Sequence, residues 1–221
     1  MTQPNALQRL QAYVPMILFG GAAVLWVVLA TSKLAQWTGS MQLLGAAVMT
    51  VYILWLLLES KVSAAESGKG HTGKDHGTLE FYAIGRIVTV TAALALPSWW
   101  HELNAVAVTG LVLFVGGIVW RLVAIRTLGR FYSHRVRTVD AHRVVDTGPY
   151  RYLRHPAYTG MLISHLGFIL FFFHPIALGL LLLLFVPSVV IRILVEEKML
   201  FGIPGYARFA EGRARLLPFV W

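Results

Sequence analysis

The chain has 221 residues, of which 57% are hydrophobic and only 13% charged, and its formal net charge is +9. Soluble domains carry about 25% charged residues, so this composition favours a polytopic membrane protein over a soluble domain. The chain contains no cysteine, which excludes disulfides, thiolate nucleophiles and cysteine-ligated metals.

Apolar runs near 20 residues long recur along the chain, and a helix of about 20 residues crosses a ~30 Å hydrocarbon core. We therefore expect an all-α fold with about six transmembrane helices. Their approximate ranges are 13–31, 40–58, 81–97, 104–125, 156–173 and 176–195. The first run lacks a small-residue cleavage site and is followed by further runs, so we expect no cleavable signal peptide.

Three polar segments separate or follow these runs: a Gly-, Ser-, Lys- and His-rich loop at 59–80, a basic stretch at 126–155, and the tail 196–221. The tail is charged but interleaved with aromatic residues, which favours an amphipathic segment at the membrane interface. With six helices, Lys33 is the only lysine or arginine on the opposite face. The positive-inside rule then predicts that both termini and all three segments are cytoplasmic. The positive net charge is thus explained by the orientation of the chain in the membrane, and we predict no nucleic-acid partner.

The loop at 59–80 contains two weak motifs. Residues 68–73 match the G-x-G-x-x-G dinucleotide pattern, but that pattern has meaning only between a strand and a helix. His71, Asp75 and His76 could bind a metal, yet a hydrophilic loop provides no rigid second shell. We interpret both as a solvated loop and predict no metal site.

Ionisable residues within predicted spans are functional hypotheses by default. Arg86 and Arg121 lie near the cytoplasmic ends of their spans, so we expect their side chains to snorkel to the interface. His165 lies mid-span, seven residues after Tyr158 and on the same helical face. We expect it to make an interhelical hydrogen bond.

Arg192, Glu196 and Glu197 end the last predicted span. Arg192 and Glu196 are four residues apart in the less favourable order for a helical ion pair. Two adjacent carboxylates at a helix C-terminus also oppose the macrodipole. Either a cationic ligand or the arginines of the 126–155 stretch could compensate them.

Residues 146–160 combine a turn, a helix start and many hydrogen-bond donors. Thr147-Gly148-Pro149 predicts the turn, and Pro156 suits the first position of a helix. The donors between and after them are Tyr150, Arg151, Tyr152, Arg154, His155 and Tyr158. The helix start and the basic loop favour an anion, whereas Glu196 and Glu197 favour a cation. A zwitterionic ligand with a separate cationic centre would satisfy both.

The run His-Arg-Val-Val-Asp-Thr-Gly-Pro-Tyr-Arg-Tyr-Leu-Arg-His-Pro-Ala-Tyr-Thr-Gly at 142–160 is followed by the Arg192, Glu196 and Glu197 set and a Gly-Tyr…Leu-Pro ending. Together they resemble the isoprenylcysteine carboxyl methyltransferase family over about residues 126–221. They are also similar to phospholipid methyltransferases and, more distantly, to the C-terminal part of sterol reductases. We accordingly divide the chain into four N-terminal spans (1–125) and a methyltransferase core (126–221) with the hairpin at 156–195.

The resemblance implies S-adenosylmethionine as cofactor, bound at the cytoplasmic face by the 126–155 stretch, the last helical hairpin and the tail. It implies catalytic roles for Arg192 and Glu196, with Arg192 facing the carboxylate of the acceptor. The implied cofactor-binding residues are Arg137, His142, Arg143, Val144, Val145, Tyr150, His155, Pro156, Ala157, Tyr158 and Glu196.

Two positions depart from the family pattern. A Phe-Gly-x-x-Tyr segment of the family can be aligned on Phe201-Gly202 or on Gly205-Tyr206, and His174 stands where the family commonly has asparagine.

The expected function is methyl transfer to a lipophilic or lipidated acceptor from the bilayer, at a carboxylate as the family name suggests. An amine- or thiol-bearing lipid is an alternative acceptor. A non-catalytic membrane scaffold or transporter, and a sterol-reductase-like nicotinamide enzyme, are alternatives of other classes.

Overall fold

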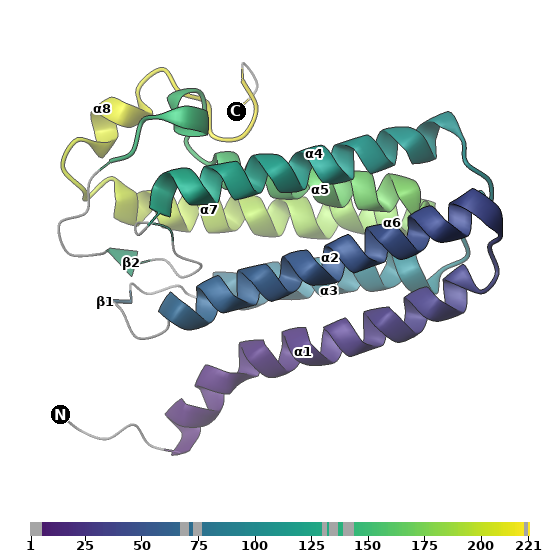
Figure 1. Cartoon of the computed structure of the whole chain (residues 1–221). Helices are drawn as coiled ribbons and strands as arrows, with labels where there is room; N and C mark the ends of the chain where they lie inside the picture. The colour runs from purple at the N-terminus through teal and green to yellow at the C-terminus, as the bar shows by residue number, and fades with distance from the viewer. Residues whose placement is uncertain are drawn as a thin grey trace.

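A computed structural model describes residues 6–66, 71–72, 77–129, 132, 137–138, 144–218 and 221. It describes only the backbone of residues 6–19, 61–66, 71–72 and 137–138. Its helices are α1 (Ala6–Leu34), α2 (Gly39–Glu66), α3 (Thr78–Ala95), α4 (Ala105–Leu128), η2 (Gly148–Arg151), α5 (Pro156–Phe171), α6 (Pro175–Leu180), η3 (Leu181–Phe185), α7 (Val186–Leu200) and α8 (Tyr206–Ala210). Its strands are β1 (His71–Thr72) and β2 (Arg137–Thr138). The long helices run side by side along one direction (Figure 1).

Among the described residues, four helical segments are long and apolar enough to cross a membrane: Gly39–Ser60, Thr78–Ala95, Ala105–Leu128 and Pro175–Leu200. Two further apolar helical segments are shorter: Gly20–Leu34, which is part of α1, and Pro156–Phe171, which is α5. The prediction of a helical multi-pass membrane protein is therefore confirmed, with four candidate spans. The other two predicted spans are helical.

Helix α2 continues through Glu66, so the prediction that a loop starts at residue 59 is wrong. Glu59 is a buried helical residue with 8% of its surface exposed. Its carboxylate forms ion pairs with Arg86 of α3 and Arg121 of α4. Because charged partners compensate it, the carboxylate can remain inside the bundle, where hydropathy alone would not place it.

Glycines bring α4 and α5 into close contact. A Cβ atom at Gly110 would lie 2.7 Å from the Gly167 carbonyl oxygen, and one at Gly160 would lie 2.7 Å from the Gly117 carbonyl oxygen. Small residues allow helix backbones to approach this closely in membranes. The same crossing places the backbone of Arg121 beside Gly160, in the second turn of α5.

The last long helix, Pro175–Leu200, is built from α6, η3 and α7. The π-helical segment η3 ends just before Pro187, which has no N–H to donate to the preceding turn. His174 caps the N-terminus, because its Nδ1 atom accepts from the Ile176 N–H at 3.2 Å. Asparagine is a preferred residue for this capping role, so His174 provides a physical substitute for it.

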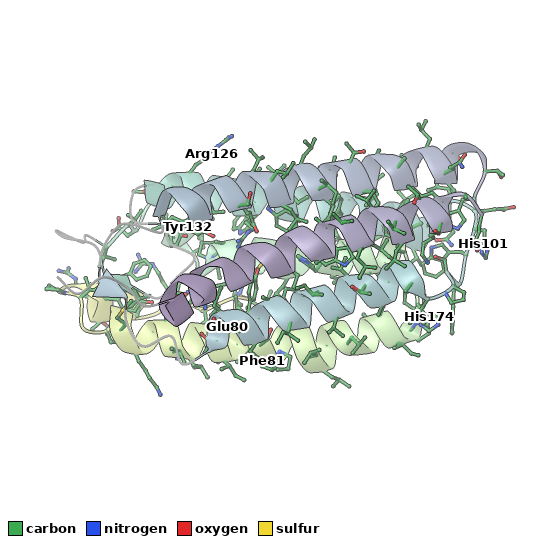
Figure 2. The ribbon with its side chains drawn as sticks, turned by 90° about the horizontal axis from the view of Figure 1, so that it is seen from below. Glu80, Phe81, His101, Arg126, Tyr132 and His174 are labelled. Atoms are coloured by element: carbon green, nitrogen blue, oxygen red, sulfur yellow. The ribbon has the colours of Figure 1, made fainter. Side chains whose placement is uncertain are left out.

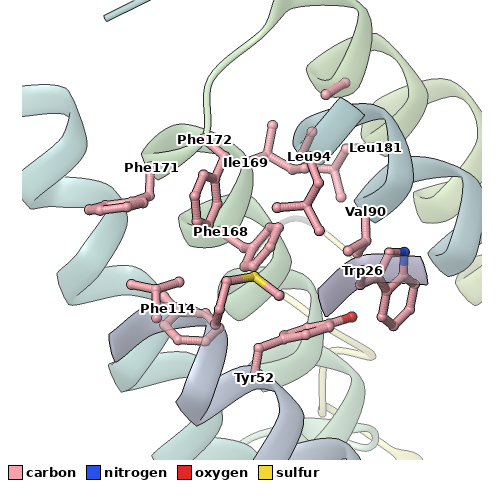
Figure 3. Packing of buried hydrophobic residues seen from close by; sticks show 14 of the residues in the cluster. Trp26, Tyr52, Val90, Leu94, Phe114, Phe168, Ile169, Phe171, Phe172 and Leu181 are labelled. Carbon is pink, nitrogen blue, oxygen red and sulfur yellow. The ribbon is translucent and has the colours of Figure 1, made fainter. Parts of the chain in front are cut away.

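Aromatic side chains fill the interior between the helices (Figure 3). The Tyr52 ring of α2 lies 5.5 Å from that of Trp26 in α1 and 5.0 Å from that of Phe168 in α5. Phe114 of α4 joins the same cluster. This core connects the N-terminal helices to the region that resembles a methyltransferase.

The two ends of the bundle differ. Tyr132 lies toward one end and His101 and His174 toward the other (Figure 2). The first end also carries α8 and a short antiparallel pair in which His71 faces Thr138 and Thr72 faces Arg137 (Figure 1). This pair joins the loop after α2 to the basic stretch after α4.

Candidate functional site

The predicted turn and helix start around residues 146–160 are confirmed. Residues Gly148–Arg151 form a single turn of 3-10 helix, which begins with Gly148 at a φ of +56° that favours glycine. Helix α5 begins at Pro156, with His155 as its N-terminal flanking residue.

The C-terminal tail closes over this segment, as expected of a tail that is not free. The Arg154 N–H donates to the Ala214 carbonyl at 2.9 Å, and the His155 N–H donates to the Arg215 carbonyl at 3.0 Å. The Thr159 hydroxyl donates to the Leu216 carbonyl at 2.8 Å. Three consecutive tail carbonyls thus hold the entry into α5.

Glu197 is the centre of an ionic cluster at this end of the bundle. Its carboxylate accepts from Arg215 Nε at 2.7 Å and from Arg154 Nη1 at 3.3 Å, and it lies 3.3 Å from His155 Nε2. The carboxylate is buried, whereas the two arginines are partly exposed. For Glu197, the hypothesis that an arginine of the 126–155 stretch compensates it is confirmed.

Tyr158 connects the two other residues of the Arg192, Glu196 and Glu197 set. Arg192 Nε donates to the Tyr158 oxygen at 3.0 Å, and the Tyr158 hydroxyl donates to Glu196 Oε2 at 3.0 Å. Arg192 Nη1 also donates to the Thr78 hydroxyl at 3.2 Å. The contact with Thr78, at the start of α3, had no signal in the sequence because it joins residues 114 positions apart.

An aromatic cluster lies next to these polar groups. Tyr132, Tyr150, Ala157, Tyr206 and Phe209 pack together. The buried Tyr206 hydroxyl has no hydrogen-bond partner among the described residues. Burial raises the pKa of both Tyr150 and Tyr206 above that of a free phenol, so both hydroxyls stay neutral and can donate.

The sequence left two alignments of the tail open, on Phe201-Gly202 or on Gly205-Tyr206, and the two aromatic residues differ in their burial. Tyr206 is buried within it, just after Gly205 with a φ of +87°. Phe201 is 49% exposed. The buried position thus belongs to the Gly205-Tyr206 alternative.

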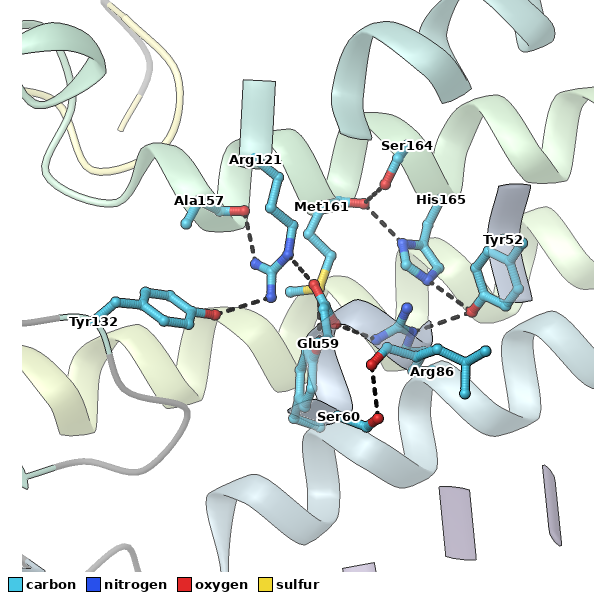
Figure 4. Close-up of polar contacts among 12 residues, drawn as sticks. Tyr52, Glu59, Ser60, Arg86, Arg121, Tyr132, Ala157, Met161, Ser164 and His165 are labelled. Carbon is cyan, nitrogen blue, oxygen red and sulfur yellow. Dashed lines mark hydrogen bonds and ion pairs between the residues drawn. The ribbon is translucent and has the colours of Figure 1, made fainter. Parts of the chain in front are cut away.

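A second polar network reaches the cluster from inside the bundle (Figure 4). Arg121 forms an ion pair with Glu59 through its Nε, donates from Nη1 to the Ala157 carbonyl at 3.0 Å, and donates from Nη2 to the Tyr132 hydroxyl at 3.2 Å. Arg86 pairs with the other Glu59 oxygen at 3.1 Å. The expectation that both arginines snorkel is wrong, since each is 2% exposed and has a buried partner.

His165 makes the predicted interhelical contact. Its Nε2 atom lies 3.3 Å from the Tyr52 hydroxyl of α2, and its Nδ1 atom lies 2.8 Å from the Met161 carbonyl oxygen. The Glu59 network itself was missed. The sequence shows only that α2, α3 and α4 each carry ionisable residues, and not which of them meet.

The predicted cofactor residues are only partly brought together. Tyr150, His155, Pro156, Ala157 and Tyr158 gather at the entry into α5, with Glu196 beside Tyr158. Val144 packs against the aromatic cluster, and Val145 is half-buried. The backbone of Arg137 lies in β2, while His142 and Arg143 lie outside the described residues.

Tyr150, Tyr158, Arg192 and Glu196 fall in a part of the chain that resembles known proteins. A sequence model of the isoprenylcysteine carboxyl methyltransferase (ICMT) family matches residues 109–202. A probable protein-S-isoprenylcysteine O-methyltransferase of Oryza sativa subsp. indica is 39% identical over 80 residues, which cover 35% of this chain and 41% of that protein.

Two further relatives are similar to part of this chain. Protein-S-isoprenylcysteine O-methyltransferase A of Arabidopsis thaliana is 32% identical over 127 residues, covering 55% of this chain and 61% of that protein. The human protein-S-isoprenylcysteine O-methyltransferase is 32% identical over 104 residues, covering 41% of this chain and 36% of that protein. The chain thus matches between about 36% and 61% of the length of these relatives. Residues 109–202, which run from α4 to just past the end of α7, are thus similar to the isoprenylcysteine carboxyl methyltransferase family.

Proposed function

We propose that this protein is an S-adenosylmethionine-dependent methyltransferase that acts on a lipophilic acceptor from the bilayer, at a carboxylate. One observation carries the proposal: Arg192, Tyr158 and Glu196 form a hydrogen-bonded chain beside a cluster of tyrosines. The match to the methyltransferase family includes all three residues. The relatives' names supply the closest acceptor class, an isoprenylcysteine carboxylate.

The described residues fit S-adenosylmethionine by their chemistry. When bound, this cofactor supplies an electrophilic methyl group on a sulfonium centre. Aromatic faces such as Tyr150 and Tyr158 attract a cation, and the Glu196 carboxylate complements positive charge. The Tyr206 hydroxyl, buried and without a partner among the described residues, is a donor for a polar group of the cofactor. His155, Pro156 and Ala157 would provide the floor at the start of α5.

Arg192 has the properties needed to hold the acceptor. Arg192 is 2% exposed, and a buried guanidinium binds a carboxylate through charge-assisted hydrogen bonds. A carboxylate acceptor is already anionic, so no strong base is needed. Orientation and exclusion of water then provide the rate acceleration, and the tail contacts at Arg154, His155 and Thr159 help to exclude water.

We also propose the finer architecture. Six helices cross the bilayer, and the site lies at the cytoplasmic face with both termini. The cytoplasmic assignment is supported by the distribution of lysine and arginine. Gathering of η2, α8 and the β1–β2 pair at one end supports a single site there (Figure 1). The methyltransferase core includes α4, because its glycine contacts with α5 position Arg121 beside Ala157.

Calorimetric titration of the detergent-purified chain with S-adenosylhomocysteine tests the cofactor proposal. We expect binding to the natural chain, at least tenfold weaker binding to Glu196→Gln, and unchanged binding to Glu211→Gln, an exposed tail carboxylate. Lack of binding to the natural chain would refute the proposed activity. Equal binding by Glu196→Gln would remove Glu196 from the site.

The acceptor atom is tested by the chemistry of the product. A methyl ester releases methanol in strong base, whereas a methylated amine or thiol does not. Membranes containing the protein, labelled with methyl-tritiated S-adenosylmethionine, should yield base-labile volatile label. Label that is stable in base would establish the amine or thiol alternative.

A further inference from the structure

The ionic network inside the bundle contains more positive than negative charge. Arg86 and Arg121 share a single carboxylate, that of Glu59. Both guanidiniums are almost completely buried, and the remaining partners of Arg121 are a carbonyl and a hydroxyl. The cluster therefore has a formal charge of +1. An unpaired charge at this depth is costly unless a partner compensates it.

Among the described residues, the polar side chains that these contacts join to Arg86 provide no negative charge. Arg86 Nε–H donates to the Tyr52 oxygen at 3.1 Å, and the Tyr52 hydroxyl can then donate to His165 Nε2. His165 Nδ1–H donates to the Met161 carbonyl, since a carbonyl can only accept. The hydrogen bonds therefore run in one direction from Arg86 through neutral side chains, with the ring tautomer assigned from this network.

Three donor groups around Arg86 lack partners. Four buried side-chain polar atoms of the described residues have no hydrogen-bond partner, and three of them are Trp55 Nε1, Arg86 Nη2 and Thr89 Oγ1. The Trp55 ring centre lies 4.9 Å from Arg86 Cζ, and Thr89 follows Arg86 by one turn of α3. Stacking on Trp55 stabilises the guanidinium in part. It satisfies neither the indole N–H nor the hydroxyl, and such unpaired buried groups are rare.

The chemistry of these groups selects an anion with one charge. The indole and the guanidinium can only donate, and the threonine hydroxyl can donate. A carboxylate would neutralise the surplus charge and accept from all three, whereas a phosphate dianion would reverse the charge. Arg86 is the ninth of the 18 residues of α3, a candidate span, so such a ligand would be surrounded by helices and lipid.

We propose that Trp55, Arg86 and Thr89 form a carboxylate-binding site inside the helical bundle. The carboxylate belongs either to a lipophilic molecule from the bilayer or to a small free carboxylate. The site is separate from the proposed methyl-transfer site, because Arg86 lies eight residues, or about 12 Å of helix, beyond Thr78, which contacts Arg192. It does not depend on the proposed activity.

The experiment measures thermal unfolding of the full chain in detergent without any cofactor. Dodecanoate, methyl dodecanoate and acetate are titrated separately. We expect dodecanoate to raise Tm, because a ligand that binds only the folded state stabilises it, and methyl dodecanoate to leave Tm unchanged. A shift with acetate at similar concentrations would assign the site to small free carboxylates, and its absence would assign it to lipophilic ones.

Two nearly isosteric variants locate the site. Trp55→Phe keeps an aromatic ring beneath Arg86 but removes the indole N–H, and Thr89→Val removes only the hydroxyl. Each should weaken dodecanoate binding by about tenfold, which corresponds to about one lost hydrogen bond. Thr109→Val, which removes an exposed hydroxyl of α4, should leave the affinity unchanged.

The results can also overturn the proposal. If neither dodecanoate nor acetate shifts Tm, or the methyl ester shifts it equally, the donors hold no anion. If both Trp55→Phe and Thr89→Val retain the full affinity, the carboxylate binds elsewhere. Arg86 itself is left unchanged, because its replacement would also break the pair with Glu59.

Discussion

The two ionic clusters of this protein, around Glu197 and around Glu59, use the same residue types in different surroundings. Each has one buried carboxylate that contacts two arginines. The arginine side chains at Glu197 are 18% and 29% exposed, whereas those at Glu59 are 2% and 3% exposed. Surplus charge at Glu197 can therefore be hydrated, whereas at Glu59 it must be compensated from within the bundle. The first cluster suits a site that is open to water, and the second suits a connection between helices whose surplus charge requires an anion inside the bundle.

Glu59→Gln should produce the largest loss of stability, because it leaves two buried guanidiniums without a carboxylate. Breaking a buried ion pair by removing one partner costs about 3–5 kcal/mol. Thermal unfolding in detergent and the yield of folded protein measure the effect. Glu80→Gln, at an exposed site of α3, is the matched control. Equal stability of the two variants would contradict the view that Glu59 stabilises the two buried arginines.

Arg192→Ala should mainly impair acceptor binding at the other end of the bundle. We expect a rise in the acceptor's KM of about 100-fold, or about 2.7 kcal/mol, with a change of less than about threefold in the Kd for S-adenosylhomocysteine. Steady-state kinetics and calorimetry measure the two quantities. If acceptor kinetics remain unchanged, Arg192 does not hold the acceptor.

Features that depend on one segment of the chain could be predicted from the sequence. The turn at Gly148 and the helix start at Pro156 were predicted correctly because glycine and proline restrict the backbone locally. His165 was predicted because a polar residue in an apolar helix needs a partner. These inferences require knowledge of one segment at a time.

Contacts between distant segments could not be predicted in this way. Glu59 pairs with residues 27 and 62 positions away, and the pairing depends on how three helices are rotated about their axes. The polar composition of residues 59–80 placed Glu59 in a loop, because a reading from composition treats each charged residue as unpaired. The tail meets α5 through the backbone carbonyls of Ala214, Arg215 and Leu216, and no residue type marks such a contact. The family resemblance supplied candidate residues in this region without their contacts.

Gly117→Ala tests the packing that joins the two clusters. An added Cβ would lie 2.6 Å from the Gly160 carbonyl oxygen, so α4 must move away from α5 and displace Arg121. Overpacking of this kind costs about 1–3 kcal/mol. The adjacent Gly116→Ala is a sensitive control, because its Cβ would meet nothing within 4 Å and alanine favours a helix. Thermal unfolding should therefore separate two substitutions that are identical in chemistry, and equal Tm values would show that the glycine contacts are unimportant.

Glu197→Gln should have the smallest effect on stability and should depend on solvent conditions. The amide can still accept from Arg215, and the exposed parts of Arg154 and Arg215 remain hydrated, so we expect a loss of about 1–2 kcal/mol. Because the ion pairs of this cluster are partly exposed, raising the salt concentration from 0.05 to about 0.5 M should narrow the difference in Tm between this variant and the natural chain. The difference caused by Glu59→Gln should change much less, since its charges are shielded from salt. If both differences respond equally to salt, the two carboxylates occupy equivalent electrostatic surroundings, and the distinction between a hydrated cluster and a buried one would be wrong.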